Sequence, residues 1–217
     1  MRKNKKILLA LFLVCLTVLV IPFFDYGYIK ANAANSGSYT YIVINGEAVI
    51  VDVDDAISGD IVIPDRFGIF KVTKIGENAF DGCMNVKKIS LGRFIKDFYS
   101  NTFSGCSVTE FSVNKDNNLI FGGSDGCIYN RNKTVLFTYP CGNERTDFTV
   151  PDGVTRIFDR AFFSADNLSE IILPDSVEQF EWVYNCPKLD YSGIKTDNKE
   201  LWEGIEINQL DGLLPRD

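Results

Sequence analysis

The sequence contains no histidine among its 217 residues. Histidine is the most frequent general base in enzymes and is required by Ser-His-Asp and Cys-His catalytic groups. Its absence excludes both arrangements. The sequence also lacks a C-x-x-C pair, so a structural zinc ion would need cysteines from widely scattered positions. We therefore expect a protein that is not an enzyme, with no catalytic residues, no metal and no cofactor.

Two weaker chemical possibilities stay open. The many acidic residues can formally supply the carboxylate pair of a hydrolase, but the sequence singles out no pair. The segment VDVDDAISGD places Asp52, Asp54 and Asp55 close together, as calcium loops do, yet it lacks the glycine and the terminal glutamate of an EF-hand loop. A solvated turn is the preferred interpretation of this segment.

The chain also has no excess of basic over acidic residues. Five of the 22 basic residues and one of the 29 acidic residues lie in residues 1–33, which leaves 17 and 28 in the rest of the chain and a net charge of −11 there. Such a surface repels phosphate backbones, so we expect no nucleic-acid partner.

The N-terminal segment has the features of an export signal. Four basic residues within positions 2–6 precede an apolar run of 18 residues, and the small-x-small site Ala31-Asn32-Ala33 follows. This pattern predicts a signal peptide over residues 1–33, cleavage after Ala33, and a secreted or cell-surface protein. The alternative is an uncleaved anchor, because the run approaches the roughly 20 residues that span a bilayer. Any membrane contact would then be made by this segment.

The rest of the chain repeats with a period of 23 residues. Ile75 recurs as Phe98, Phe80 as Phe103, Cys83 as Cys106, and Ile157 as Phe180. A period of about 20 to 30 residues marks a solenoid, whose units must stack to bury their apolar faces. We expect short strands at 61–63, 89–91, 111–113, 148–150 and 171–173, a weaker one at 189–191, and one-turn helical or 3₁₀ pieces between them.

Two β-hairpins and a tail complete the prediction. Asn45-Gly46 between alternating apolar residues predicts a type I′ hairpin that caps the first coil. A second hairpin, turning at residues 130–133, is expected in an insertion over 114–146, with Cys127 projected near Leu136. The repeat domain would cover residues 34–191, and residues 192–217 would form an acidic C-terminal cap or tail.

The repeats resemble the BspA-like, or treponeme-type, leucine-rich repeats of secreted and cell-surface proteins. That pattern is roughly V-T-x-I-G-x-x-A-F-x-x-C-x-x-L-x-x-I-x-[IL]-P, and the chain reads VTKIGENAFDGCMNVKKISLG from Val72 and VTRIFDRAFFSADNLSEIILP from Val154. The second copy departs from it at Phe158 and Ala165. The resemblance implies a mainly β leucine-rich-repeat solenoid with a parallel sheet, short helical or 3₁₀ turns, an N-terminal hairpin cap and an inserted hairpin.

Three of the cysteines recur at one position of the repeat. Cys83, Cys106 and Cys186 fall where the family often has cysteine, and stacking would place them in a buried structural column. Disulfides between neighbours, or reactive thiols, are the alternatives. A bridge between Cys127 and Cys141 is not expected.

The resemblance implies a non-catalytic role in protein–protein interaction or adhesion, with a host or matrix surface protein as a partner. Alternation of side chains points one row of residues outward, and a partner would dock there: Lys88, Glu110, Thr149, Glu170 and Ile172. A solvated face is the alternative reading of this row. A structural or accessory part of a larger surface assembly is the first alternative function, and a carboxylate-based hydrolase is a remote second.

Overall fold

The computed structural model describes residues 33–99, 101–180 and 182–208. The chain divides into two compact units, Met1–Ala34 and Asn35–Asp217. The predicted signal peptide lies outside the described residues except for its last position. Among the described residues, no helix has the length and hydrophobicity to span a membrane.

The N-terminal hairpin forms as predicted. Its turn residues Asn45 and Gly46 have φ values of 51° and 78°, which a type I′ turn requires of both. The strands around it belong to the first sheet: β1 (Ala34–Ser36), β2 (Tyr39–Ile44), β3 (Glu47–Val53), β5 (Arg66–Phe67), β6 (Phe70–Ile75) and β8 (Asp97–Phe98). β2 pairs antiparallel with β3, and β3 pairs parallel with β6, so the hairpin covers the start of the repeats.

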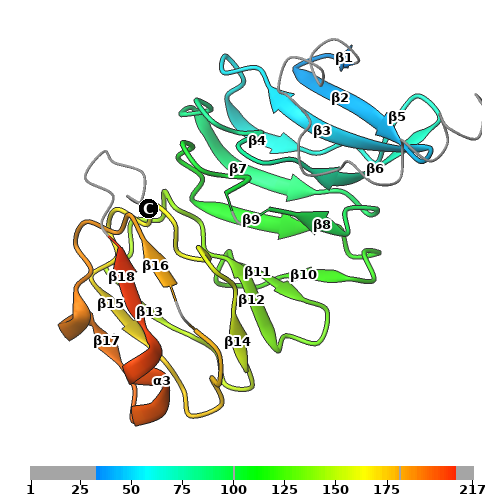
Figure 1. Cartoon of the computed structure of the whole chain (residues 1–217). Helices are drawn as coiled ribbons and strands as arrows, with labels where there is room; N and C mark the ends of the chain where they lie inside the picture. Colours follow the sequence, from blue (N-terminus) through cyan, green and yellow to red (C-terminus); the bar gives the residue numbers. More distant parts are fainter. Residues whose placement is uncertain (1–32, 100, 181, 209–217) are drawn as a thin grey trace, which may run out of the picture. The chain divides into compact units, whose positions relative to one another are not determined.

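One series of parallel strands follows the repeat and is divided between two sheets. Its first three strands are β4 (Gly59–Val62), β7 (Val86–Leu91) and β9 (Glu110–Val113), which stack in that order (Figure 1). Three more form a second sheet: β13 (Asp147–Thr149), β15 (Glu170–Ile172) and β17 (Ile194–Lys195). Ile89 pairs with Phe111, and Phe148 pairs with Ile171. The 22- and 23-residue offsets match the repeat.

A second ladder runs through the next segment of each coil. Ile75 pairs with Phe98, as the period predicted. Farther along, β12 (Val135–Thr138) pairs parallel with β14 (Arg156–Ile157), and Arg156 forms a bridge with Gln179. The short segments between the two ladders consist of tight turns; for example, Asp81 donates its backbone N–H to the carbonyl of Asn78 at 2.9 Å.

The insertion contains the predicted hairpin and one additional strand. β11 (Ile128–Asn130) pairs antiparallel with β12, and Asn130 Oδ1 accepts the backbone N–H of Thr134 at 2.8 Å, which closes the turn. β10 (Ile120–Gly122), which pairs with β11, was not predicted. The projected neighbourhood of Cys127 and Leu136 is wrong, because Leu136 pairs with Tyr129 and the register shifts at Ile128/Tyr129.

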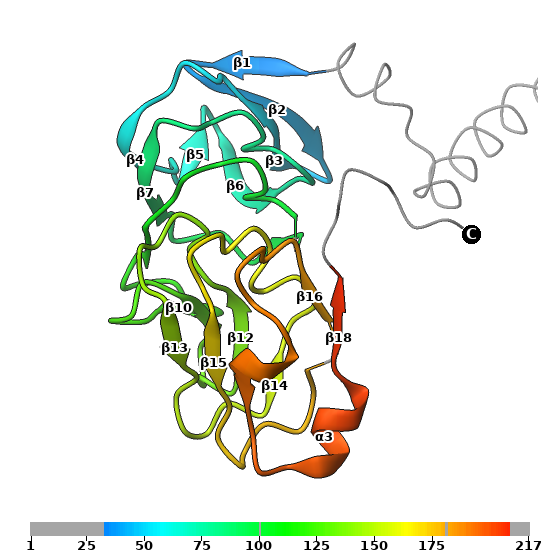
Figure 2. The same ribbon diagram turned by 90° about the vertical axis from the view of Figure 1, so that its left-hand side faces the viewer.

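The C-terminal segment differs from the prediction. The weak strand expected at 189–191 does not form; the 3₁₀ helix η1 (Tyr191–Gly193), whose N-cap Asp190 accepts two backbone N–H groups, begins there. The next rung of the ladder is β17, three residues beyond the expected strand. After it, α3 (Lys199–Gly204) leads into β18 (Glu206–Asn208), which pairs with β16 (Trp182–Tyr184) at the C-terminal end of the stack (Figure 2).

Contacts between aromatic rings, tilted or edge-on to each other, link successive coils in the core. The ring centroids of Phe80 and Phe103 are 5.4 Å apart, and those of Phe162 and Phe180 are 5.9 Å apart. In the coil between these pairs, Tyr139 takes the same place and lies 5.5 Å from Phe162. The buried residues form two clusters, one on each side of the insertion.

Candidate binding face

The first part of the predicted face is an ordered polar surface on β4, β7 and β9. Lys88 and Glu110 occupy paired positions, and Lys88 Nζ lies 2.8 Å from Glu110 Oε2. Beside them, the hydroxyl oxygens of Ser90 and Ser112 are 2.7 Å apart. The Glu110 carboxylate raises the pKa of Lys88 by hydrogen bonding and by its charge. Both partners are about half exposed, so the pair adds little to stability.

The second part lies on β13, β15 and β17 and has a different character. Asp147 pairs in register with Glu170, and Thr149 with Ile172. Strand neighbours lie about 4.8 Å apart, so two acidic residues are neighbours on the same face of the sheet. Within the described ranges, neither Asp147 nor Glu170 forms an ion pair. Ile172 is half-buried next to this acidic pair.

The insertion separates these two parts. Phe111 of β9 donates its backbone N–H to the carbonyl of Gly126 at 2.8 Å, so a turn of the insertion occupies the edge of β9. β9 and β13 consequently belong to different sheets. Lys88 and Glu110 are therefore neighbours on one sheet, and Thr149, Glu170 and Ile172 are neighbours on another. The two groups do not share a hydrogen-bonded ladder.

All three cysteines of the predicted column are buried; Cys83 and Cys106 belong to one core cluster and Cys186 to the other. Cys83 and Cys186 are fully buried, and burial raises the pKa of their thiols to about 11 and about 12 respectively. Cys106 lies against Cys141, with 3.7 Å between the two sulfur atoms. The repeat pattern in the sequence did not assign Cys141 to the cysteine position of its coil. The signal was Tyr139-Pro-Cys, which places cysteine two residues after the aromatic residue instead of three.

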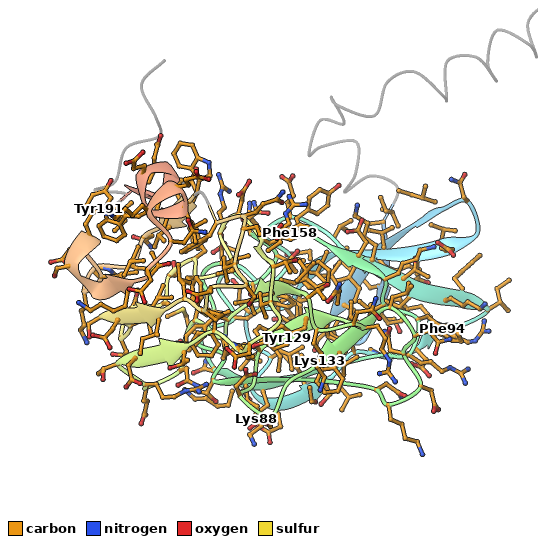
Figure 3. All side chains as sticks on the ribbon, turned by 90° about the horizontal axis from the view of Figure 1, so that it is seen from below. Lys88, Phe94, Tyr129, Lys133, Phe158 and Tyr191 are labelled. Atoms are coloured by element: carbon orange, nitrogen blue, oxygen red, sulfur yellow. The ribbon has the colours of Figure 1, made fainter. Side chains whose placement is uncertain are left out.

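A basic cluster around Phe94 was also missed. The charged groups of Arg66, Lys71 and Arg93 lie 5.3, 4.8 and 4.5 Å from the centre of the Phe94 ring. Phe94 and Lys88, both labelled in Figure 3, lie in different regions of the surface. Arg66 and Lys71 come from the β5–β6 hairpin, whereas Arg93 and Phe94 are adjacent in a later turn, so no single local pattern in the sequence marks the cluster.

The described residues contain no candidate metal site. No group of three or more histidine, cysteine, aspartate or glutamate side chains within them is arranged to hold a metal ion. Asp52, Asp54 and Asp55 therefore do not form a calcium cluster there.

A family model described as the BspA type leucine rich repeat region, in six copies, matches residues 60–140 and 133–203. These ranges cover more than half of the chain, and the chain belongs to this family. Its fold is the leucine-rich-repeat solenoid that the sequence predicted. No curated protein matches the sequence.

Several solved bacterial structures are similar to the chain. A leucine-rich cell surface protein from Faecalibacterium prausnitzii is 18% identical, with 76% of each chain covered and a TM-score of 0.30. The T. pallidum leucine-rich repeat protein is 16% identical, with 82% of each chain covered and a TM-score of 0.39. A leucine-rich repeat protein from Bacteroides capillosus is 19% identical, with 83% of this chain and 95% of that chain covered and a TM-score of 0.35. Such low TM-scores carry no argument of their own, and the family assignment rests on the repeat match.

Proposed function

We propose that the protein is exported and acts at the cell surface as a non-catalytic module that binds another protein. Membership of a leucine-rich-repeat family supports a role in protein interaction, since solenoids bind partners through extended faces. The observation that carries the proposal is the acidic pair of Asp147 and Glu170. In-register like charges cost stability, and a basic partner would relieve their repulsion.

The binding face in this proposal comprises Lys88, Glu110, Thr149, Glu170 and Ile172. Its two parts can engage one partner across the insertion, with Ile172 supplying an apolar contact beside the charges. Each part is small, so one domain binds modestly and many copies on a surface bind far more strongly through avidity. A host or matrix surface protein is the partner class that this arrangement would serve.

Charge reversal tests the face directly. We expect the double variant Glu110→Lys/Glu170→Lys to lose binding to a partner from surface extracts by at least several-fold, because two carboxylates of the face become cations. Its Tm should stay close to that of the wild type, since the exposed Lys88–Glu110 pair is worth no more than about 1 kcal/mol. Binding is measured by surface plasmon resonance and stability by calorimetry.

A matched control separates the face from net charge. Glu77→Lys/Glu203→Lys changes the net charge equally at two other exposed positions and should leave binding intact. An equal loss in both variants would show a nonspecific charge effect. If the face variant binds normally while substitutions in residues 114–146 abolish binding, the hairpin is the binding element and the face is only solvated.

Export has its own test. N-terminal sequencing of the protein from culture medium should give Ala34 as the first residue, from the signal pattern of residues 1–33. A cell-bound product that begins at Met1 would instead support an uncleaved anchor.

A further inference from the structure

Two thiols from different coils meet where the insertion rejoins the solenoid. Cys106 and Cys141 are 35 positions apart in the sequence, and their sulfur atoms are 3.7 Å apart. A disulfide bond is about 2.05 Å long, so the sulfurs need to approach by about 1.7 Å, which side-chain rotation and small coil movements can supply.

Both cysteines are buried, but a little residue surface remains exposed at each. Cys106 and Cys141 retain 9% and 7% of their surface exposed, whereas Cys83, Cys127 and Cys186 retain none. A small cavity of about 10 Å³, enough for about one water molecule, is lined in part by Cys141. Two buried hydroxyl groups in its lining have no hydrogen-bond partner, those of Ser104 and Tyr139. A reagent entering by this route must therefore be small and polar.

The pair lies at the junction between the two core clusters. Cys141 packs into the N-terminal cluster, while Tyr139, two residues earlier, belongs to the C-terminal cluster. The backbone crosses between the clusters at this point, where Gly142 donates its N–H to the carbonyl of Val108 at 2.8 Å. A covalent link between Cys106 and Cys141 would tie the end of the insertion to the preceding coil.

We propose that Cys106 and Cys141 form a redox site, in which a small hydroperoxide converts the two thiols into a disulfide that fastens the inserted hairpin to the solenoid. The oxidised form would predominate outside the cell, where disulfides persist. The site is independent of the binding face, since none of the face residues touches either sulfur atom.

The reaction balances with hydrogen peroxide as the oxidant. The Cys141 sulfur attacks one peroxide oxygen, the O–O bond breaks, and the leaving hydroxide takes the thiol proton to become water. This step leaves a sulfenic acid on Cys141. The Cys106 sulfur then attacks the Cys141 sulfur, the S–O bond breaks, and a second water molecule leaves with the Cys106 proton. The two thiols lose two electrons, and the peroxide gains them.

The surroundings favour Cys141 as the first nucleophile. The hydrogen-bonding contact with Cys106 lowers the pKa of the Cys141 thiol, with help from the backbone groups of Val108 and Gly142. The same contact and burial raise the pKa of Cys106. The thiolate is the reactive form of cysteine, so the lowered pKa of Cys141 favours attack by its sulfur.

Peptide mapping tests the proposal on the full-length chain. The fully reduced protein is treated with one equivalent of hydrogen peroxide, denatured, alkylated without reductant and digested. We expect a linked peptide that joins Cys106 to Cys141, and a fall in the thiol count from six to four. We also expect Tm to rise by roughly 5–10 °C on oxidation and to return on reduction with dithiothreitol, because the link closes a long loop.

Two variants test whether the disulfide specifically requires Cys141. Cys141→Ser should abolish the linked peptide and leave Cys106 fully alkylated, whereas Cys83→Ser should form the link as the wild type does. Recovery of Cys106 and Cys141 as separate alkylated peptides from oxidised wild type would overturn the proposal. A disulfide between either of them and any other cysteine would overturn it as well. The wild-type map decides the matter even if a variant fails to fold.

Discussion

The contact between Gly142 and the preceding coil gives a strong test of how the insertion is joined to the solenoid. A methyl group at position 142 would lie 2.3 Å from the carbonyl oxygen of Ser107 and 2.5 Å from its carbonyl carbon. Both atoms are backbone, so no side chain can rotate away. Real contacts of this kind are not shorter than 3.0 Å, and the two coils would have to separate by at least about 0.7 Å.

The size of the effect follows from what this separation disrupts. Overpacking in a tight interior costs about 1–3 kcal/mol. The hydrogen bond from Gly142 N–H to Val108 O, 2.8 Å long, is worth about 1 kcal/mol more. We therefore expect Gly142→Ala to lower the free energy of unfolding by about 2–4 kcal/mol, and Tm by roughly 4–16 °C for a domain of this size.

Gly204→Ala is the matched control. No atom lies within 4 Å of a methyl group at position 204, which is the last residue of α3. Since alanine favours helix more than glycine does, this variant should be neutral or stabilised by up to about 1 kcal/mol. Urea denaturation measures both variants under the same conditions. A Gly142→Ala protein within about 0.5 kcal/mol of the wild type would refute the close coil contact.

Two further predictions concern the core. Phe162→Ala should lower the free energy of unfolding by about 3–5 kcal/mol, because the ring is buried and contacts Tyr139 and Phe180. Phe94→Ala is the control: its ring is half-buried, so the loss measured in the same urea titration should be clearly smaller. The pKa of Cys83, raised to about 11, leaves only about one thousandth of the thiol ionised at pH 8, so alkylation of the folded protein at Cys83 should be slow and should accelerate about tenfold per pH unit toward pH 11. Rapid labelling of Cys83 at pH 8, followed by mass spectrometry, would contradict the burial on which that expectation rests.

The local sequence was enough to establish the period and the turns. Ile75 and Phe98 were matched by their spacing and pair directly in the structure. Asn45-Gly46 specified its hairpin because both residues accept positive φ at low cost. Alternation of polar and apolar residues placed Phe111 inside and Glu110 outside, since successive side chains of a strand point to opposite faces.

Contacts across the insertion were decided by tertiary packing. The period relates residues one coil apart, but a long insertion leaves open which segment stacks on β9. The structure places the carbonyl of Gly126 there, and this divides the face that looked continuous in the sequence. It also brings Cys141 against Cys106, although the shortened spacing after Tyr139 hid Cys141 from the repeat pattern.

Tertiary packing also decided the position of the C-terminal strand β17 and the formation of the basic cluster around Phe94. The segment at 189–191 has a strand-like composition, yet Asp190 caps a 3₁₀ turn and delays the strand to Ile194. Phe94 contacts the adjacent Arg93 and also Arg66 and Lys71 of an earlier segment, which the sequence alone does not relate to it. Sequence patterns encode local geometry and regular stacking, whereas contacts between irregular segments depend on how the whole chain fills space.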